Sequence, residues 1–179
     1  MKWSVFIFCF LCSVSVFSQQ DFPQSWVGNY RGELEIYTVD SVAMRLPMQL
    51  AIQPTKRDSV YTWAIIYDIK NNRDVRSYEL KIVDSAKGHY MIDEKNGILI
   101  DSYYRNGILT GFFDVNQTFI IATYQKQGDS IVFEIISASD KPVRMSGDLQ
   151  VSKDTIPEVK SFEVNGRQKA VLHHVNMHK

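Results

Sequence analysis

The chain has 179 residues, which is enough for one domain with a sizeable core, and its 20 basic residues are balanced by 20 acidic ones. This balance, with no local run of Lys or Arg, excludes the electrostatic footprint that nucleic-acid binding requires. The only two cysteines, Cys9 and Cys12, both lie near the amino terminus.

Residues 1–18 are predicted to be a secretory signal peptide. Lys2 precedes an apolar run from Trp3 to Leu11, and Ser18 provides a small residue at the expected cleavage point. The apolar stretch ends before the roughly 20 residues that a membrane span needs. We therefore expect an exported protein, periplasmic or secreted, with no membrane span. Removal of both cysteines with the leader excludes disulfides and thiol chemistry, and favours the bacterial envelope.

The mature chain opens with segments that alternate between apolar and polar residues. Residues 26–37 place Trp26, Tyr30 and Leu34 on one face and charged residues on the other, which predicts a strand with one face in water. After a reversal at Asp40-Ser41, residues 42–53 repeat the alternation and predict an antiparallel partner. Residues 60–69 and 75–84 predict the third and fourth strands.

Two Asn-Gly pairs, at 96–97 and 106–107, divide the middle of the chain. Each predicts a type I′ hairpin turn, because Asn and Gly reach positive φ at little steric cost. Further turn sites at 116–117 and 127–129 extend the pattern to a five-strand meander over residues 89–138. No helical period appears up to Ala138. The prediction is an all-β fold, an antiparallel up-and-down meander of about eight to ten strands closed into a barrel.

We expect one domain, residues 19–179, with its barrel core over residues 26–151. Residues 145–151 alternate and are compatible with a further strand. Residues 157–175 are expected to form an extended or short helical segment that packs outside the barrel. Several middle strands are apolar on both faces, so either this segment or a second copy of the protein should cover the outer face.

The stretch Trp26-Val27-Gly28-Asn29-Tyr30-Arg31-Gly32, followed by a continuous meander, resembles the opening of calycin-like barrels such as lipocalins, avidins and nitrobindin-type haem proteins. The resemblance implies a Trp or Gly plug at the closed end and a ligand cavity at the other. Lipocalins carry Gly-x-Trp where this chain has Trp26-x-Gly28, and residues 38–41 leave no room for the helix pair of fatty-acid-binding proteins. A haem barrel would need an axial histidine.

The four histidines are His89, His173, His174 and His178, of which His173 is the best placed for such a role. Histidines near a chain end usually face solvent, so we expect no cofactor and no metal.

The candidate ligand-binding residues are Trp26, Tyr30, Trp63, Tyr67, Arg76 and Tyr78. Arg76 and Tyr78 share one face of a predicted strand, and carboxylate-binding barrels use such a charged and neutral donor pair. The simpler interpretation, which we prefer, is that Arg76 pairs with Asp74 or Asp68 at the rim.

Asp93, Glu94 and Asp101 flank the first Asn-Gly turn, and paired carboxylates can perform general acid-base catalysis. Hairpin ends are solvated, however, and the sequence has no calcium loop, zincin, hydrolase or P-loop motif. We therefore prefer a binding protein to an enzyme. The main hypothesis is a small, apolar or amphipathic ligand inside the barrel. The alternative is an interaction module with a packed interior that forms a homodimer or binds a partner through its apolar strands.

Overall fold

The computed structural model describes residues 22–69, 72–152 and 154–175, so the predicted leader lies outside the described part. The described chain is almost entirely β-structure. It begins with a short 3₁₀ helix, η1 (Gln24–Trp26), and the first five strands are β1 (Gly28–Tyr37), β2 (Val42–Pro54), β3 (Val60–Ile69), β4 (Asn72–Asp84) and β5 (His89–Asp93). The remaining strands are β6 (Leu99–Arg105), β7 (Ile108–Val115), β8 (Thr118–Gln127), β9 (Ser130–Ser146), β10 (Leu149–Val151), β11 (Asp154–Ile156) and β12 (Val159–His174).

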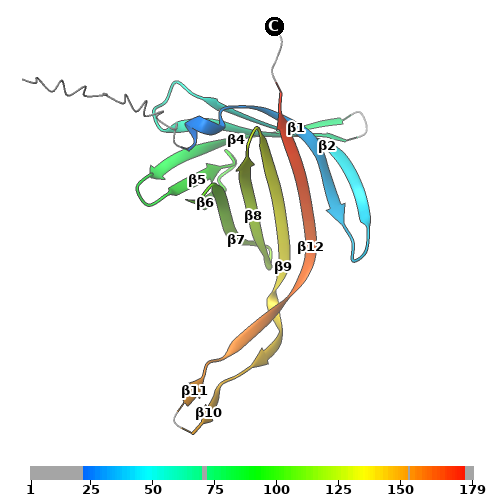
Figure 1. Cartoon of the computed structure of the whole chain (residues 1–179), viewed down its shortest axis with the longest axis vertical. Coiled ribbons are helices and arrows are strands. Elements are labelled where there is room, and N and C mark those ends of the chain that lie inside the picture. The colour runs from blue at the N-terminus through cyan, green and yellow to red at the C-terminus, as the bar shows by residue number, and fades with distance from the viewer. Residues whose placement is uncertain (1–21, 70–71, 153, 176–179) are drawn as a thin grey trace, which may run out of the picture.

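The strands form a closed antiparallel barrel in the order β1-β12-β9-β8-β7-β6-β5-β4-β3-β2, with β10 and β11 in a separate two-stranded sheet (Figure 1). The predicted up-and-down meander is confirmed, because each strand from β1 to β8 pairs with the next one in the chain. None of the helices in the described ranges is long and apolar enough to cross a membrane.

The turn chemistry agrees with the prediction at one Asn-Gly pair and differs at the other. Asn106 and Gly107 both have positive φ, 44° and 84°, as a type I′ turn requires. At the first pair, positive φ falls instead on Lys95 and Gly97. The loop there is wider, because the Glu94 N–H donates to the Ile98 carbonyl at 3.1 Å across it.

The barrel is closed by β12, which pairs with β1 on one side and β9 on the other. The expectation that residues 157–175 pack outside the barrel is therefore wrong for residues 168–173, which pair with both β1 and β9. Ala170 and Leu172 are buried and alternate with the exposed Val171, so this segment is a wall strand with one inward face. Gly32 permits its close approach, since a Cβ there would lie 2.1 Å from the Val171 carbonyl oxygen.

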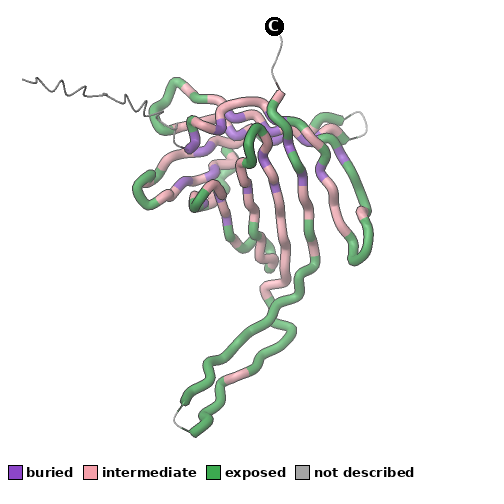
Figure 2. Tube along the Cα trace, in the orientation of Figure 1, coloured by how far each residue is buried: buried purple, intermediate pink, exposed green. Residues whose placement is uncertain are grey.

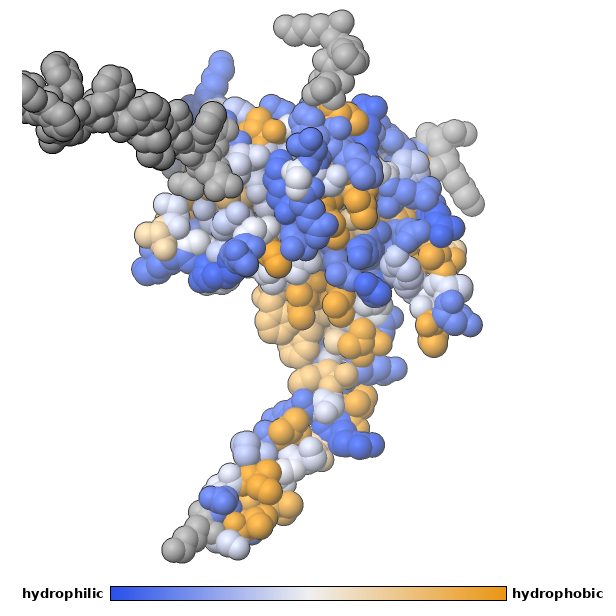
Figure 3. Space-filling model, viewed as in Figure 1, coloured by the Kyte–Doolittle hydropathy of each residue, from blue (hydrophilic) through white to orange (hydrophobic). Residues whose placement is uncertain are grey.

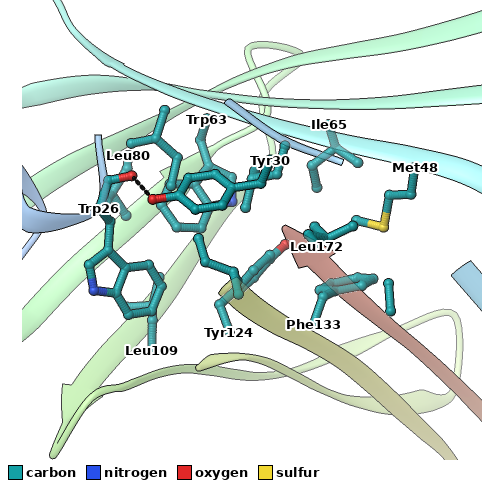
Figure 4. Packing of buried hydrophobic residues seen from close by; sticks show 14 of the residues in the cluster. Trp26, Tyr30, Met48, Trp63, Ile65, Leu80, Leu109, Tyr124, Phe133 and Leu172 are labelled. Atoms are coloured by element: carbon teal, nitrogen blue, oxygen red, sulfur yellow. Dashed lines mark hydrogen bonds between the residues drawn. The ribbon is translucent and has the colours of Figure 1, made fainter. Parts of the chain in front are cut away.

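The packed core fills the end of the barrel next to η1, where the buried residues gather (Figure 2). Trp26 is 1% exposed and closes this end, with its ring 6.4 Å from that of Trp63. Tyr30, Leu172 and other inward side chains from strands around the barrel belong to the same core (Figure 4). Apolar packing at one end thus leaves the opposite end of the interior less filled.

Strands β9 and β12 continue past the barrel as a long hairpin that carries β10 and β11 at its tip (Figure 1). We call residues 140–164 the arm. It leaves the wall because β8 pairs with β9 only up to Ser139 and β1 pairs with β12 only up to Gln168. Residues 145–151 are not one strand, since β9 ends at Ser146 and β10 begins at Leu149.

The outer face of the middle strands stays uncovered in the single chain. Phe112 and Ile121 are 63% and 39% exposed, so the C-terminal segment, which contacts Phe119 through Phe162, does not cover this face as one of the two expectations had it. The segment is needed as a wall strand and is therefore not free to fold back over the barrel.

Candidate functional site

A cavity of about 490 Å³ lies inside the barrel between the packed core and the end opposite Trp26. This volume is within the range of small-molecule binding sites. Most of its wall comes from apolar residues of β3 and β5–β9, including Ile65, Ile92, Ile100, Leu109, Phe113, Ile120, Ala122, Phe133 and Ile135. The interior is therefore partly hollow, as a ligand-binding barrel requires.

The structure separates the six predicted ligand-binding residues into two groups. Trp26, Tyr30 and Trp63 are at most 1% exposed and belong to the packed core at the closed end. Tyr67, Arg76 and Tyr78 line the cavity. All six face inward, and their depth along the barrel axis decides which of them touch the cavity.

Arg76 stands at the cavity mouth and is paired on its own strand. Its Nε lies 3.2 Å from an Asp74 carboxylate oxygen, which is the rim pairing that the sequence analysis preferred. Its guanidinium also lies over the Tyr67 ring, 5.0 Å from the ring centre. Arg76 is thus both a rim ion-pair partner and part of the cavity lining.

Three phenols of the cavity remain neutral donors at physiological pH. Burial raises the pKa of Tyr67. Burial also raises the pKa of Tyr124, an effect that the neighbouring Trp63 indole N–H partly offsets. For Tyr78, burial and then the nearby Glu94 carboxylate raise the pKa, while Arg76 lowers it. The cavity therefore offers neutral hydroxyl groups within an apolar surface.

Four polar residues that line the cavity were not predicted from the sequence: Ser102, Glu94, Asp114 and Tyr124. Ser102 is 3% exposed and its hydroxyl donates a long hydrogen bond of 3.5 Å to the Ile100 carbonyl. Period two in residues 119–124 could have identified Tyr124, which shares a face with Ala122. Glu94 was recognised as an acid beside a turn, and only the fold directs it to the cavity.

The three carboxylates around the first turn have different partners. Asp93 pairs with Lys81 at 2.5 Å, and Asp101 contacts His89 at 2.6 Å. Glu94 alone of the three lines the cavity. The structure therefore does not bring them together as an acid-base pair.

The described histidines lie away from the cavity lining. His173 Nδ1 is 2.9 Å from the Ser130 hydroxyl, and the His174 ring packs edge-on against Tyr30 at the closed end. No group of three potential metal ligands occurs among residues 22–69, 72–152 and 154–175. His178 lies outside these ranges.

The chain matches no protein-family model, and no curated protein matches it.

Proposed function

We propose that this protein is an exported, lipocalin-like binding protein that holds a small, largely apolar ligand in its barrel cavity. The observation that supports the proposal is the cavity of about 490 Å³ at the end opposite Trp26, with an apolar wall and few polar groups. Of the residues predicted from the sequence, Tyr67, Arg76 and Tyr78 are the polar contacts available to orient a ligand. Trp26, Tyr30 and Trp63 would act indirectly, by closing the other end.

Binding would be driven by removal of apolar surface from water. About ten buried methylene groups contribute on the order of 8 kcal/mol before the costs of association are subtracted. Neutral hydroxyl groups at the cavity wall add orientation at little desolvation cost compared with charges.

The proposal is tested by a substitution that places a bulky side chain in the cavity and leaves the outer face of the barrel wall unchanged. Ala122 lines the cavity, and its neighbour Thr123 is on the opposite face of β8. Ala122→Phe should weaken binding of the neutral fluorescent probe N-phenyl-1-naphthylamine at least tenfold, whereas Thr123→Phe should leave it unchanged. Circular dichroism checks that both variants fold. Equal probe binding by wild type and a folded Ala122→Phe variant would contradict the proposal.

A second candidate function is association through the outer wall. We call Phe112, Phe119, Ile121, Ile136, Phe162 and Val164 the outer band. The rings of Phe112 and Phe119 are 5.7 Å apart, and those of Phe119 and Phe162 are 5.4 Å apart. Figure 3 shows apolar side chains on the lower wall that continue onto the arm. An apolar surface of this kind favours a homodimer or a protein partner.

Analytical ultracentrifugation tests this candidate. If the outer band is an interface, the wild-type protein should sediment as a dimer at micromolar concentration, and the double variant Phe112→Ser, Val164→Ser should sediment as a monomer. The control Ile65→Val changes an apolar residue inside the cavity and should leave the association unchanged. A wild-type protein that sediments as a monomer would rule out self-association through the outer band.

A further inference from the structure

The inward-facing charges at the cavity mouth do not cancel. Arg76 and Glu94 both line the cavity, and Asp74 pairs with Arg76 from the same face of β4. These three residues therefore contribute one positive charge, from Arg76, and two negative charges, from Glu94 and Asp74. Asp114 adds a further negative charge at the rim, where it lines the end of the cavity.

Glu94 has no cationic partner of its own within the described ranges. Lys95, which follows Glu94 in the turn, pairs with Glu79 at 3.3 Å, and Lys81 on β4 pairs with Asp93 at 2.5 Å. One Glu94 oxygen accepts a hydrogen bond from the Asn96 side chain at 3.3 Å. Together with the nearby Tyr78 hydroxyl, this bond still leaves part of the acceptor capacity of the carboxylate free.

The turn itself fixes the position of Glu94. The Glu94 N–H donates to the Ile98 carbonyl at 3.1 Å, and the Asn96 side chain accepts from the Ile98 N–H at 2.9 Å. The carboxylate is also close enough to Tyr78 to raise the pKa of that phenol. A preformed acceptor thus stands beside an aromatic ring that lines the same cavity.

We infer that the cavity takes an amphipathic amine, with its ammonium group at Glu94 and its hydrocarbon body against the apolar wall below. The inference rests on the proposed function and specifies its ligand class. An ammonium would supply the positive charge that Glu94 has no partner for and would lie near Tyr78, an aromatic residue of a type that can interact with cations. A carboxylate ligand would have to compete with Asp74 for Arg76 and would approach Glu94 with like charge.

The experiment compares three ligands that share one hydrocarbon chain and differ in head-group charge. Dodecylamine, dodecanol and dodecanoate, each below its micelle concentration, are titrated against the wild-type protein loaded with N-phenyl-1-naphthylamine. The dissociation constant of the amine, measured by displacement of the probe, should be at least fivefold lower than that of the alcohol, as expected for one partly exposed ion pair. Dodecanoate should be the weakest of the three.

Two variants assign this preference to Glu94. Glu94→Gln should abolish the advantage of the amine and leave dodecanol binding unchanged. Asp101→Asn removes the same charge from an exposed position on the neighbouring strand, outside the cavity. It should change neither the advantage of the amine nor the affinity for dodecanol.

The outcomes separate this inference from the proposed function. If dodecanol displaces the probe but dodecylamine binds no more tightly, or if dodecanoate binds best, the amine inference is overturned and the binding function stands. A preference for the amine that survives Glu94→Gln also overturns it. If neither the probe nor any of the three ligands binds, the proposed function fails and the inference fails with it.

Discussion

The Tyr30 hydroxyl donates a hydrogen bond of 3.0 Å to the Trp26 carbonyl oxygen, and this contact joins the plug at the closed end to the first strand (Figure 4). Both residues are almost fully buried, at 0% and 1% exposure. Lys126 donates to the same hydroxyl oxygen at 3.0 Å from β8. The phenol therefore links η1, β1 and β8 through one polar atom.

Replacing this phenol should destabilise the barrel. In Tyr30→Phe, the buried Trp26 carbonyl loses its donor and Lys126 loses its acceptor, so the free energy of unfolding should fall by about 1–3 kcal/mol. Urea denaturation measures the change. Tyr103→Phe is the control, because Tyr103 is 45% exposed, and it should lie within about 0.5 kcal/mol of wild type. Equal unfolding midpoints for both variants would contradict a structural role for this hydroxyl.

Closure of the barrel should depend on the missing side chain at Gly32. An alanine Cβ would lie 2.1 Å from the Val171 carbonyl oxygen, so Gly32→Ala must push β12 away from β1. We expect the free energy of unfolding to fall by about 1–3 kcal/mol, the usual cost of overpacking. Thermal unfolding measures it, with Glu33→Ala on the same strand as a control, since that side chain is 57% exposed. A Gly32→Ala protein as stable as the control would show that the two strands can separate freely.

Stability should depend on pH through the ion pair between β4 and β5. The Lys81 ammonium, and then the Lys95 backbone N–H, hold the pKa of Asp93 below its ordinary value of 3.8. Because the folded-state pKa is lowered, the stabilisation is fully present above the ordinary pKa and is lost as pH falls through the lower, folded-state value.

The measurement is the urea midpoint of wild type and Lys81→Met at about pH 7 and about pH 2. The wild-type protein should be the more stable one near neutrality, and the difference should shrink in acid. A difference that stays constant over this range would assign the role of Lys81 to packing of its hydrocarbon stem instead.

The arm should be dispensable for folding of the barrel. Its tip strands β10 and β11 pair only with each other, and an isolated two-stranded hairpin contributes little stability in water. Replacing residues 144–161 with an Asn-Gly turn should leave the thermal midpoint within a few degrees of wild type. If the arm and the outer band form an interface, the same deletion should reduce self-association. Loss of the barrel's circular dichroism signal would show that the arm is part of the folding unit.

The strands up to Ala138 could be predicted because alternation marks each one locally and short turns allow only neighbouring strands to pair. The closing strand could not be predicted in the same way. Residues 159–174 carry exposed apolar side chains such as Val164 and Val171 beside charged ones, so their alternation is weak. Their place in the wall follows from the free edges of β1 and β9, which lie about 100 residues apart in the chain.

The sequence predicted that Trp26, Tyr30, Trp63, Tyr67, Arg76 and Tyr78 face the interior, because successive side chains of a strand point to opposite faces, although Trp26 lies in η1 and not in β1. Only the tertiary structure decided that the first three fill the closed end and the last three line a cavity. The reason is that depth along a barrel axis depends on the stagger between all of its strands, which no single strand records. The same stagger brings Glu94, from a turn that looked solvated, to the mouth of the cavity beside Tyr78.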